Sequence, residues 1–283
     1  MPLSAGEFDY VRKLVHQRAG IALEPGKEYL VESRLDPLAR QEGFPSLKLF
    51  IAELKANPFA SLHHKVVQAM TTTETSFFRD VRPFDVLKSL VLPELLAKRA
   101  AERRLTLWCA ASSNGQEPYS VAMLLREAVP ALIATWNIRL IASDISTEVL
   151  ARAVQGRYSQ LEVNRGLPAG LLMKYFEKHG DGWQIKGEIR RMVEFREMNL
   201  TEEWSTLPPL DVIFMRNVLI YFNVATKMDI FAKVGRVLKP GGFLFLGSSE
   251  TTVNLESGFE PVPANRGVCF RLRPPKRESD GSH

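Results

Sequence analysis

From about residue 105 onward, short apolar runs alternate with amphipathic segments, and this alternation restricts the fold more than any other feature of the sequence. The runs expected as strands are LTLWCAAS, NIRLIASD, MVEFREMNL, DVIFM, FLFLGSS and GVCFRLR. Helical spacing is expected over 116–129, 147–154 and 225–238, with a KPGG turn before FLFLGSS. The alternation predicts an α/β fold, a doubly wound and mainly parallel sheet with helices on both faces.

The first 80 residues carry helical spacing throughout and predict a separate, small all-helical domain. Its first helix is expected to end at Ala19-Gly20, and three more are expected over KEYLVESRLDPLARQEG, SLKLFIAELKAN and LHHKVVQAM. Helical character then continues to about Arg104. The predicted buried side chains of the first two helices are Phe8, Val11, Leu14 and Val15, then Tyr29, Leu30, Leu35 and Leu38.

Residues 158–196 fit the alternation poorly. The segment KYFEKHGDGWQIKGEIRRMVEFRE has short strand-like runs, and His179-Gly180-Asp181-Gly182 is typical of a tight hairpin. We therefore predict a small β insertion, residues 158–196, within a second domain of residues 81–273. A polar tail, 274–283, is expected to be disordered.

Composition indicates a cytoplasmic globular protein, expected to be a monomer. Hydrophobic residues make up 45% and charged residues 24% of the chain, and no run of 18 apolar residues occurs. The N-terminus has no apolar signal core, so neither export nor membrane insertion is expected. Cys109 and Cys269 lie in apolar runs, which favours buried thiols over a disulfide or a metal pair, and no metal is expected.

The net charge of +5 does not indicate nucleic-acid binding. Residues 1–80 contain ten Lys or Arg and ten Asp or Glu, and the surplus lies partly in AKRAAERR (97–104) and RLRPPKRE (271–278). These segments are typical of a solvated helix end and a tail. No nucleic-acid partner is expected.

The strand-to-helix turn AASSNGQEPYS is the first candidate site. It has one glycine, Gly115, where a dinucleotide-binding turn has three, so a phosphate cradle is poorly supported. Glu117 could meet a cationic ligand group, or could merely complement the dipole of the helix that it begins. Asp144 ends the next strand, where an acid can bind ribose hydroxyls or cap the following helix. A glycine turn without a phosphate cradle, followed by an acid placed for ribose, favours S-adenosylmethionine over NAD.

Three further motifs are expected at the same sheet edge. MTTTETSFFRD (70–80) precedes the sheet, while MNL (198–200) and RNVLIYFN (216–223) follow strands. Each could be an ordinary loop or cap. Because the carboxyl ends of parallel strands meet at one edge, their convergence predicts an active site.

TTTETSFFRD, AASSNGQEPYS, ASDISTEVLARA, RNVLIYFN and LKPGGFLFLGSSE, in this order, resemble the CheR-type chemotaxis receptor methyltransferases. The resemblance covers roughly residues 5–273, including YLVESRLDPLAR in the helical domain. It implies a Rossmann-like methyltransferase sheet and methyl transfer from S-adenosylmethionine to glutamate side chains of chemoreceptor cytoplasmic helices. The implied cofactor contacts are Thr73, Thr75, Arg79, Glu117, Asp144, Asn199, Leu200, Arg216 and Asn217.

The resemblance also implies that Arg79 and Tyr221 lie nearest the transferred methyl group and the incoming carboxylate. The sequence departs from the family at Thr73, where Asn is common, and at Asn114 and Gln116, where Thr and Glu are common. In some members the β insertion binds a receptor C-terminal pentapeptide. The hairpin here is short, and we expect no need for the pentapeptide.

Recognition of the receptor is expected from Lys27, Arg34 and Arg40 in the helical domain, although ordinary solvated charges explain them as well. Two other functions remain as alternatives. An adenine amino-methyltransferase would typically carry Asp/Asn-Pro-Pro-Tyr/Phe after the fourth strand, where this chain has Arg-Asn-Val-Leu. A regulator that binds the cofactor without catalysis is opposed by the presence of Arg79 and Tyr221.

Overall fold

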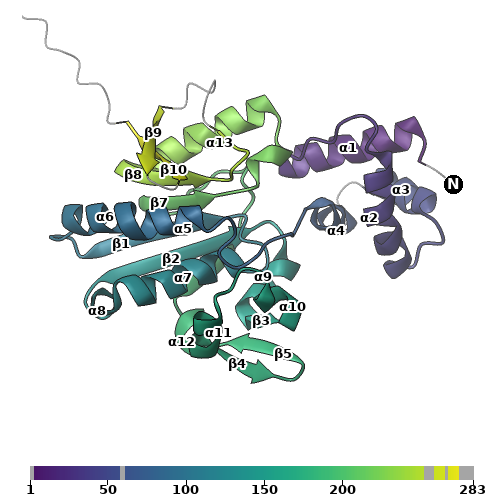
Figure 1. The fold of residues 1–283 in the computed structure, drawn as a ribbon. Coiled ribbons are helices and arrows are strands. Elements are labelled where there is room, and N and C mark those ends of the chain that lie inside the picture. Colours follow the sequence, from purple (N-terminus) through teal and green to yellow (C-terminus); the bar gives the residue numbers. More distant parts are fainter. Residues whose placement is uncertain (1–2, 58–60, 252–257, 265–266, 274–283) are drawn as a thin grey trace, which may run out of the picture.

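The computed structural model describes residues 3–57, 61–251, 258–264 and 267–273 of the 283-residue chain. Its main sheet has seven strands in the order β6-β2-β1-β7-β8-β10-β9 (Figure 1). The five strands from β6 to β8 run parallel, and β10 is antiparallel to both of its neighbours. The strands are β1 (Arg104–Ala110), β2 (Asn137–Asp144), β6 (Val193–Glu197), β7 (Leu210–Met215), β8 (Leu238–Leu246), β9 (Phe259–Ala264) and β10 (Gly267–Leu272). The doubly wound α/β prediction is confirmed.

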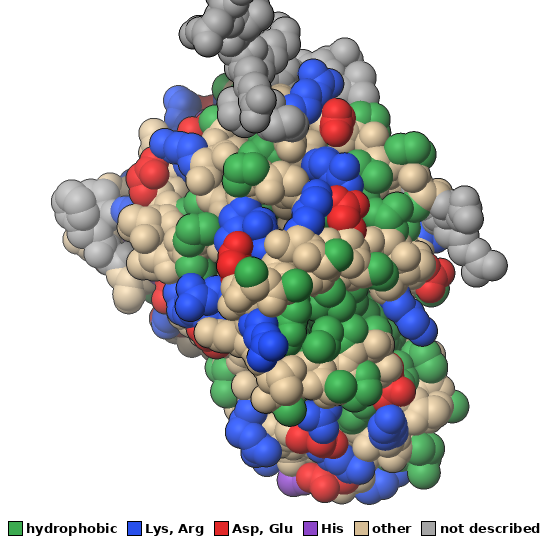
Figure 2. Space-filling view, turned by 90° about the vertical axis from the view of Figure 1, so that its left-hand side faces the viewer, with side chains coloured by type: hydrophobic (Ala, Val, Ile, Leu, Met, Phe, Trp, Pro, Cys, Tyr) green, Lys and Arg blue, Asp and Glu red, His purple; other side chains and the backbone are tan. Residues whose placement is uncertain are grey.

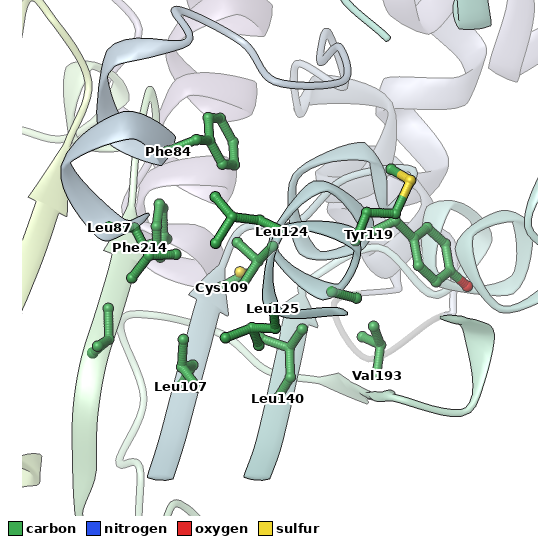
Figure 3. Close-up of a cluster of buried hydrophobic side chains, with 14 of the residues drawn as sticks. Phe84, Leu87, Leu107, Cys109, Tyr119, Leu124, Leu125, Leu140, Val193 and Phe214 are labelled. Carbon is green, nitrogen blue, oxygen red and sulfur yellow. The ribbon is translucent and has the colours of Figure 1, made fainter. Parts of the chain in front are cut away.

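Helices cover both faces of this sheet because successive strand residues point to opposite sides. Leu107 and Cys109 of β1 join the core beneath α5, α6 and α7 (Figure 3). Trp108 and Ala110 join the core on the other face, which α13 covers (Figure 1). The helices are α5 (Arg82–Val86), the π-helix η1 (Leu87–Val91), α6 (Leu92–Lys98), α7 (Gln116–Ala128), α8 (Pro130–Ile133), α9 (Thr147–Gln155), the 3₁₀-helix η2 (Leu219–Tyr221) and α13 (Val224–Val237). Cys109 and Cys269 are buried free thiols, as predicted.

The N-terminal segment folds as four helices with an apolar core of their own. They are α1 (Ala5–Ala19), α2 (Glu28–Gln41), α3 (Leu47–Ala56) and α4 (Leu62–Met70). A capping box between Ser4 and Glu7 begins α1, and Gly20 ends it at the predicted break with a φ of +71°. A Cβ on Gly20 would lie 2.6 Å from Cγ2 of Thr201, so the glycine lets the end of α1 approach the main sheet closely.

The β insertion contains a second, antiparallel sheet of order β3-β5-β4. The predicted hairpin is confirmed, because β4 and β5 pair on either side of Gly180. Most of the remaining segment is helical, and β6, at the end of the segment, lies in the main sheet. Its elements are β3 (Arg157–Tyr158), α10 (Gln160–Asn164), α11 (Ala169–Tyr175), β4 (Phe176–His179), β5 (Gly182–Ile185) and α12 (Gly187–Arg190).

Three details differ from the sequence-based expectations. Tyr29 is 61% exposed, and α2 instead buries Val31, Leu35 and Ala39. The KPGG segment is part of β8 and not a turn before it, because a bulge against β7 accommodates Gly241 at a φ of +73°. The strand β9 was not predicted; it contains two prolines, which an edge strand tolerates.

No helix among the described residues combines the length and the apolarity needed to cross a bilayer. The predicted disordered tail, 274–283, lies outside the described residues. Figure 2 shows the face opposite the helical domain, where Lys and Arg side chains are interspersed with acidic and apolar ones. The described side chains on this face therefore do not form a uniform basic surface.

Candidate active site

One cleft at the carboxyl edge of the main sheet brings all the predicted site residues together. It encloses about 1000 Å³ of space, open solvent at its mouth included. The predicted residues that line it are Thr73, Thr75, Arg79, Glu117, Asp144, Asn199, Leu200, Arg216, Asn217 and Tyr221. Their individual roles remain predictions, but their convergence follows from the parallel strands that end at this edge.

The turn between β1 and α7 forms the floor of the cleft. Gly115 has a φ of +89°, and a Cβ there would lie 2.9 Å from Cβ of Ala153. Ala111 and Ser113 also have positive φ values, 52° and 50°, although neither is a glycine. Such conformations cost free energy and persist where the surrounding structure enforces them, which is common at binding sites. The positive φ and the close packing against α9 therefore require a glycine at position 115.

Glu117 and Arg216 form a buried ion pair at the centre of the cleft. The Arg216 guanidinium, whose side chain is 1% exposed, donates to Oε2 of Glu117 at 2.7 Å and to Oδ2 of Asp80 at 2.7 Å. It also donates to the backbone oxygen of Arg79 at 2.9 Å. Burial raises the pKa of Glu117, while the charges of Arg216 and Arg79 oppose that rise. Arg216 thus stabilises the carboxylate and holds the loop that carries Arg79.

Asp144 is nearly buried at the end of β2. Its Oδ2 accepts the Ser113 backbone N–H at 2.8 Å, and its Oδ1 accepts that of Ser146 at 3.0 Å. Burial raises the pKa of Asp144, and these backbone donors oppose the rise. Because a carboxylate offers about four acceptor positions, both oxygens retain capacity for ligand hydroxyls. Both roles considered from the sequence, ribose acid and helix cap, are compatible with this geometry.

The loop of residues 71–81 forms a side wall. Nη1 of Arg79 donates to the Glu74 backbone oxygen at 3.1 Å, which folds its side chain back over the loop. Thr73 accepts a hydrogen bond at its backbone oxygen from Oγ of Ser113, at 2.7 Å. The loop and the turn after β1 are therefore joined directly, so that Thr75 and Arg79 stand beside the turn.

Asn199 reaches the cleft with a side chain that is already engaged. Its Nδ2 donates to the Arg18 backbone oxygen at 2.7 Å, and its Oδ1 accepts from Thr201. The amide therefore ties α1 to the segment after β6.

The helical domain supplies part of the cleft wall. The sequence did not single out Ala19 and Ile21, whereas Met70, Thr71 and Thr72 belong to a motif predicted at this edge. The lining residues that it contributes are Ala19, Ile21, Met70, Thr71 and Thr72. Arg34 of α2 holds this wall, since its guanidinium donates to the Met70 backbone oxygen at 2.5 Å and to Oγ1 of Thr72 at 2.9 Å. The residue that we predicted as a receptor contact therefore also has a structural role.

Glu250 is a further residue that the sequence did not single out. Its Oε2 accepts the backbone N–H groups of Asn217 and Gly247, both at 2.7 Å. Its Oε1 accepts those of Leu219 at 2.7 Å and Ile220 at 3.3 Å. One carboxylate thus holds the loop after β7, in which Asn217 has a φ of +59°. The only sequence signal was its place in the motif LKPGGFLFLGSSE.

The cleft fits S-adenosylmethionine better than it fits a dinucleotide. Oγ of Ser112 and Nε of Arg216 are buried and have no hydrogen-bond partner in the protein, although both residues line the cleft. Buried polar atoms normally find partners, so these two favour a polar ligand. Two acids and no phosphate cradle suit a cationic nucleoside. Among the described residues, no group of His, Cys, Asp or Glu gathers as a metal site would require.

The fold and the cleft define the class of S-adenosylmethionine-dependent methyltransferases. Residues 73–268 match the family described as "CheR methyltransferase, SAM binding domain", and residues 6–71 match "CheR methyltransferase, all-alpha domain". The chain therefore belongs to the CheR methyltransferase family.

Curated relatives named as chemotaxis protein methyltransferases match this chain over nearly their whole length. Chemotaxis protein methyltransferase Cher2 of Pseudomonas putida is 39% identical over 94% of this chain and 98% of its own. Chemotaxis protein methyltransferase 1 of Pseudomonas aeruginosa is 40% identical over 96% of this chain and 100% of its own. Among solved structures, a putative S-adenosyl-L-methionine-dependent methyltransferase of Methanococcus maripaludis aligns with 74% of this chain and 99% of its own. Its 13% identity and TM-score of 0.35 are too low to support an argument.

Proposed function

We propose that the protein transfers a methyl group from S-adenosylmethionine to glutamate carboxylates on the cytoplasmic helices of chemoreceptors, which yields methyl esters. The main support is that Glu117, Asp144, Arg79 and Tyr221 line one cleft in a chain of the CheR family. In this proposal Glu117 holds the cationic amino-acid end of the cofactor and Asp144 holds its ribose. The remaining predicted contacts are Thr73, Thr75, Asn199, Leu200, Arg216 and Asn217.

The proposed mechanism needs no general base. A glutamate side chain with an ordinary pKa, well below 7, is already ionised at neutral pH and can act as the nucleophile. S-adenosylmethionine, when bound, supplies a methyl group activated by its sulfonium. The protein then contributes placement and exclusion of water. Arg79 orients the incoming carboxylate, the Tyr221 hydroxyl helps to position it, and the apolar wall residues Ile21 and Met70 limit access of water.

The decisive experiment offers tritiated S-adenosylmethionine and purified receptor cytoplasmic fragments, with and without their C-terminal tails, to the protein. Base-labile label on both fragments is the expected result, since carboxyl esters hydrolyse in base and the short hairpin suggests no need for a pentapeptide. Label confined to nucleic acid, or no label on any receptor, would contradict the proposal. A requirement for the tail would contradict only the expectation about the pentapeptide.

Substitution of the two proposed catalytic residues tests the mechanism. Tyr221→Phe and Arg79→Ala are each expected to lower kcat/KM for the receptor by about 10–100-fold, because each removes a group that orients the carboxylate. The thermal midpoint and the affinity for S-adenosylhomocysteine are measured alongside, so that losses of folding or of cofactor are recognised. Wild-type kcat/KM in both variants would refute the assignment.

We further propose that residues 1–80 form a receptor-recognition domain, with Lys27, Arg34 and Arg40 facing an acidic methylation helix. Lys27 immediately precedes α2, and the side chain of Arg40 is 79% exposed. The double change Lys27→Glu and Arg40→Glu is expected to raise KM for the receptor by about 5–10-fold, more at low salt, with KM for the cofactor unchanged. Arg34 is left intact because it supports the cleft wall.

The double change Lys48→Glu and Lys55→Glu, at two exposed positions on α3 of the same domain, is the matched control for charge. If the three positions are ordinary solvated charges, the double variant and this control will behave alike. That outcome would remove these residues from the recognition surface while leaving the proposed reaction untouched.

A further inference from the structure

The β insertion contacts the turn between β1 and α7 (residues 111–115) directly, and this turn is called the cofactor turn below. The Tyr158 hydroxyl donates to the backbone oxygen of Asn114 at 2.8 Å. The same hydroxyl lies 3.3 Å from the position that a Cβ on Gly115 would occupy. Tyr158 is almost fully buried, so this contact is protected from solvent. Tyr158 thus supports the turn through its hydroxyl, and it is not among the residues that line the cleft.

The insertion also holds the loop that carries Thr75 and Arg79. Phe77, which is fully buried, packs edge-on against Tyr158 and Phe176, with ring centroids 4.9 and 5.6 Å apart. Edge-to-face pairs of this kind fix the orientation of the rings. Because Phe77 lies midway between Thr75 and Arg79 in sequence, its anchorage restricts where both can point.

Gly166 presses against the same loop. Its φ is +88°, and a Cβ there would lie only 2.2 Å from the backbone oxygen of Phe77. No residue with a side chain fits without moving one of the two segments. On the opposite side, the loop is bonded to the cofactor turn and to α7, since Oγ of Ser113 donates to the Thr73 oxygen and the Phe78 N–H donates to Oγ of Ser120. The loop is therefore held between the insertion and the turn.

We propose that Tyr158 and Gly166 are positioning residues, through which the β insertion sets the geometry of the cofactor turn and of the loop of residues 71–81. Tyr158 acts mainly on the turn, and Gly166 acts mainly on the loop. The insertion then works within its own chain as a support for the active site, whatever it binds on its outer surface. The roles of Thr75 and Arg79 in this inference rest on the function proposed above.

Gly166→Ala tests the support of the loop, with Gly180→Ala as its matched control. Both glycines have positive φ and lie in the same insertion, but a Cβ on Gly180 would meet nothing within 4 Å. Gly166→Ala is expected to weaken binding of S-adenosylhomocysteine by about tenfold or more and to lower kcat, because the loop must shift. Gly180→Ala is expected to carry similar backbone strain and to bind like the wild type.

Amide hydrogen exchange of the ligand-free full chain gives a second readout that needs neither cofactor nor receptor. Faster exchange over residues 71–81 in Gly166→Ala, but not in Gly180→Ala, is expected. Equal exchange and equal binding in the two variants would overturn the inference. A failure of receptor labelling would instead refute the proposed function, so the two failures can be distinguished.

Tyr158→Phe tests the support of the turn. It keeps the ring against Phe77 and removes only the bond to Asn114, so affinity for S-adenosylhomocysteine and KM for the cofactor should weaken severalfold while kcat changes little. Tyr175→Phe is the control, because the Tyr175 hydroxyl bonds to Glu127, away from the cleft. If both variants bind equally well, or if Tyr158→Phe affects only thermal stability, Tyr158 does not position the turn.

Discussion

Replacing Arg216 with methionine is expected to abolish cofactor binding under ordinary assay conditions and to destabilise the fold. The guanidinium is buried and holds Glu117, Asp80 and the Arg79 backbone at once. Its removal leaves the Glu117 carboxylate buried without its partner, which typically costs about 3–5 kcal/mol of unfolding free energy. Chemical denaturation measures that loss. Titration with S-adenosylhomocysteine is expected to show a Kd at least roughly 30-fold weaker.

The same substitution changes how stability depends on pH. Burial already raises the pKa of Glu117 above its ordinary value of 4.5, and Arg216 opposes that rise. Without Arg216 the pKa rises further, so the folded variant binds a proton that the unfolded chain releases near pH 4.5. The unfolding free energy of the variant should therefore fall, relative to the wild type, as pH increases from 4.5 through the raised pKa. Binding of the cationic ligand has the opposite trend, because it requires the ionised carboxylate.

Two further variants separate charge from packing. Arg216→Met combined with Glu117→Gln is expected to recover much of the lost stability without recovering ligand affinity, because it removes the buried charge but also removes the ligand's acceptor. Arg236→Met changes an arginine whose side chain is 61% exposed and should have little effect. If Arg216→Met alone retains wild-type stability and affinity, the buried pair is not the centre of the site.

Much of this architecture could be predicted from the sequence because its signals are local or follow from the topology. The strand runs before Glu117 and Asp144 predicted where two acids would lie, and parallel strands necessarily bring their carboxyl ends to one edge. The departure at Thr73 is accommodated, since its backbone oxygen accepts the hydrogen bond from Ser113. Asn114 contributes its backbone oxygen to Tyr158, whereas its side-chain Oδ1 is buried without a hydrogen-bond partner.

The features that were missed depend on contacts between segments distant in the chain. Ala19 and Ile21 line the cleft, and the glycine between them lets the end of α1 approach Thr201 closely. Arg34 resembles a surface charge in sequence, yet its partners lie 36 to 38 residues further on. Tyr29 has the spacing of a buried residue, but α2 packs on an adjacent stripe centred on Leu35. The spacing of apolar residues predicts that a helix has an apolar side, but it does not define which of those residues the neighbouring helices cover.

Glu250→Gln is expected to impair the active site strongly although the residue itself is absent from the cleft lining. The glutamine amide keeps one acceptor oxygen and presents an NH₂ group to two of the four N–H groups that the carboxylate now accepts. Each partly buried N–H left without an acceptor costs about 1–3 kcal/mol. The loop after β7 should therefore relax, and Asn217 should leave its positive φ. We expect kcat/KM to fall by about 10–100-fold, measured by transfer of tritium to a receptor fragment.

Two comparisons make this expectation specific to the carboxylate. Glu250→Asp keeps the charge but is one methylene shorter, so it can serve some of the four donors and should give an intermediate loss. Glu197→Gln makes the same chemical change at an exposed position at the end of β6 and should behave as the wild type. Because η2 follows this loop and carries Tyr221, Glu250→Gln should lower kcat as well as cofactor affinity. A loss of thermal stability alone, with normal kcat and KM in the folded protein at low temperature, would show that Glu250 supports the fold without positioning the site.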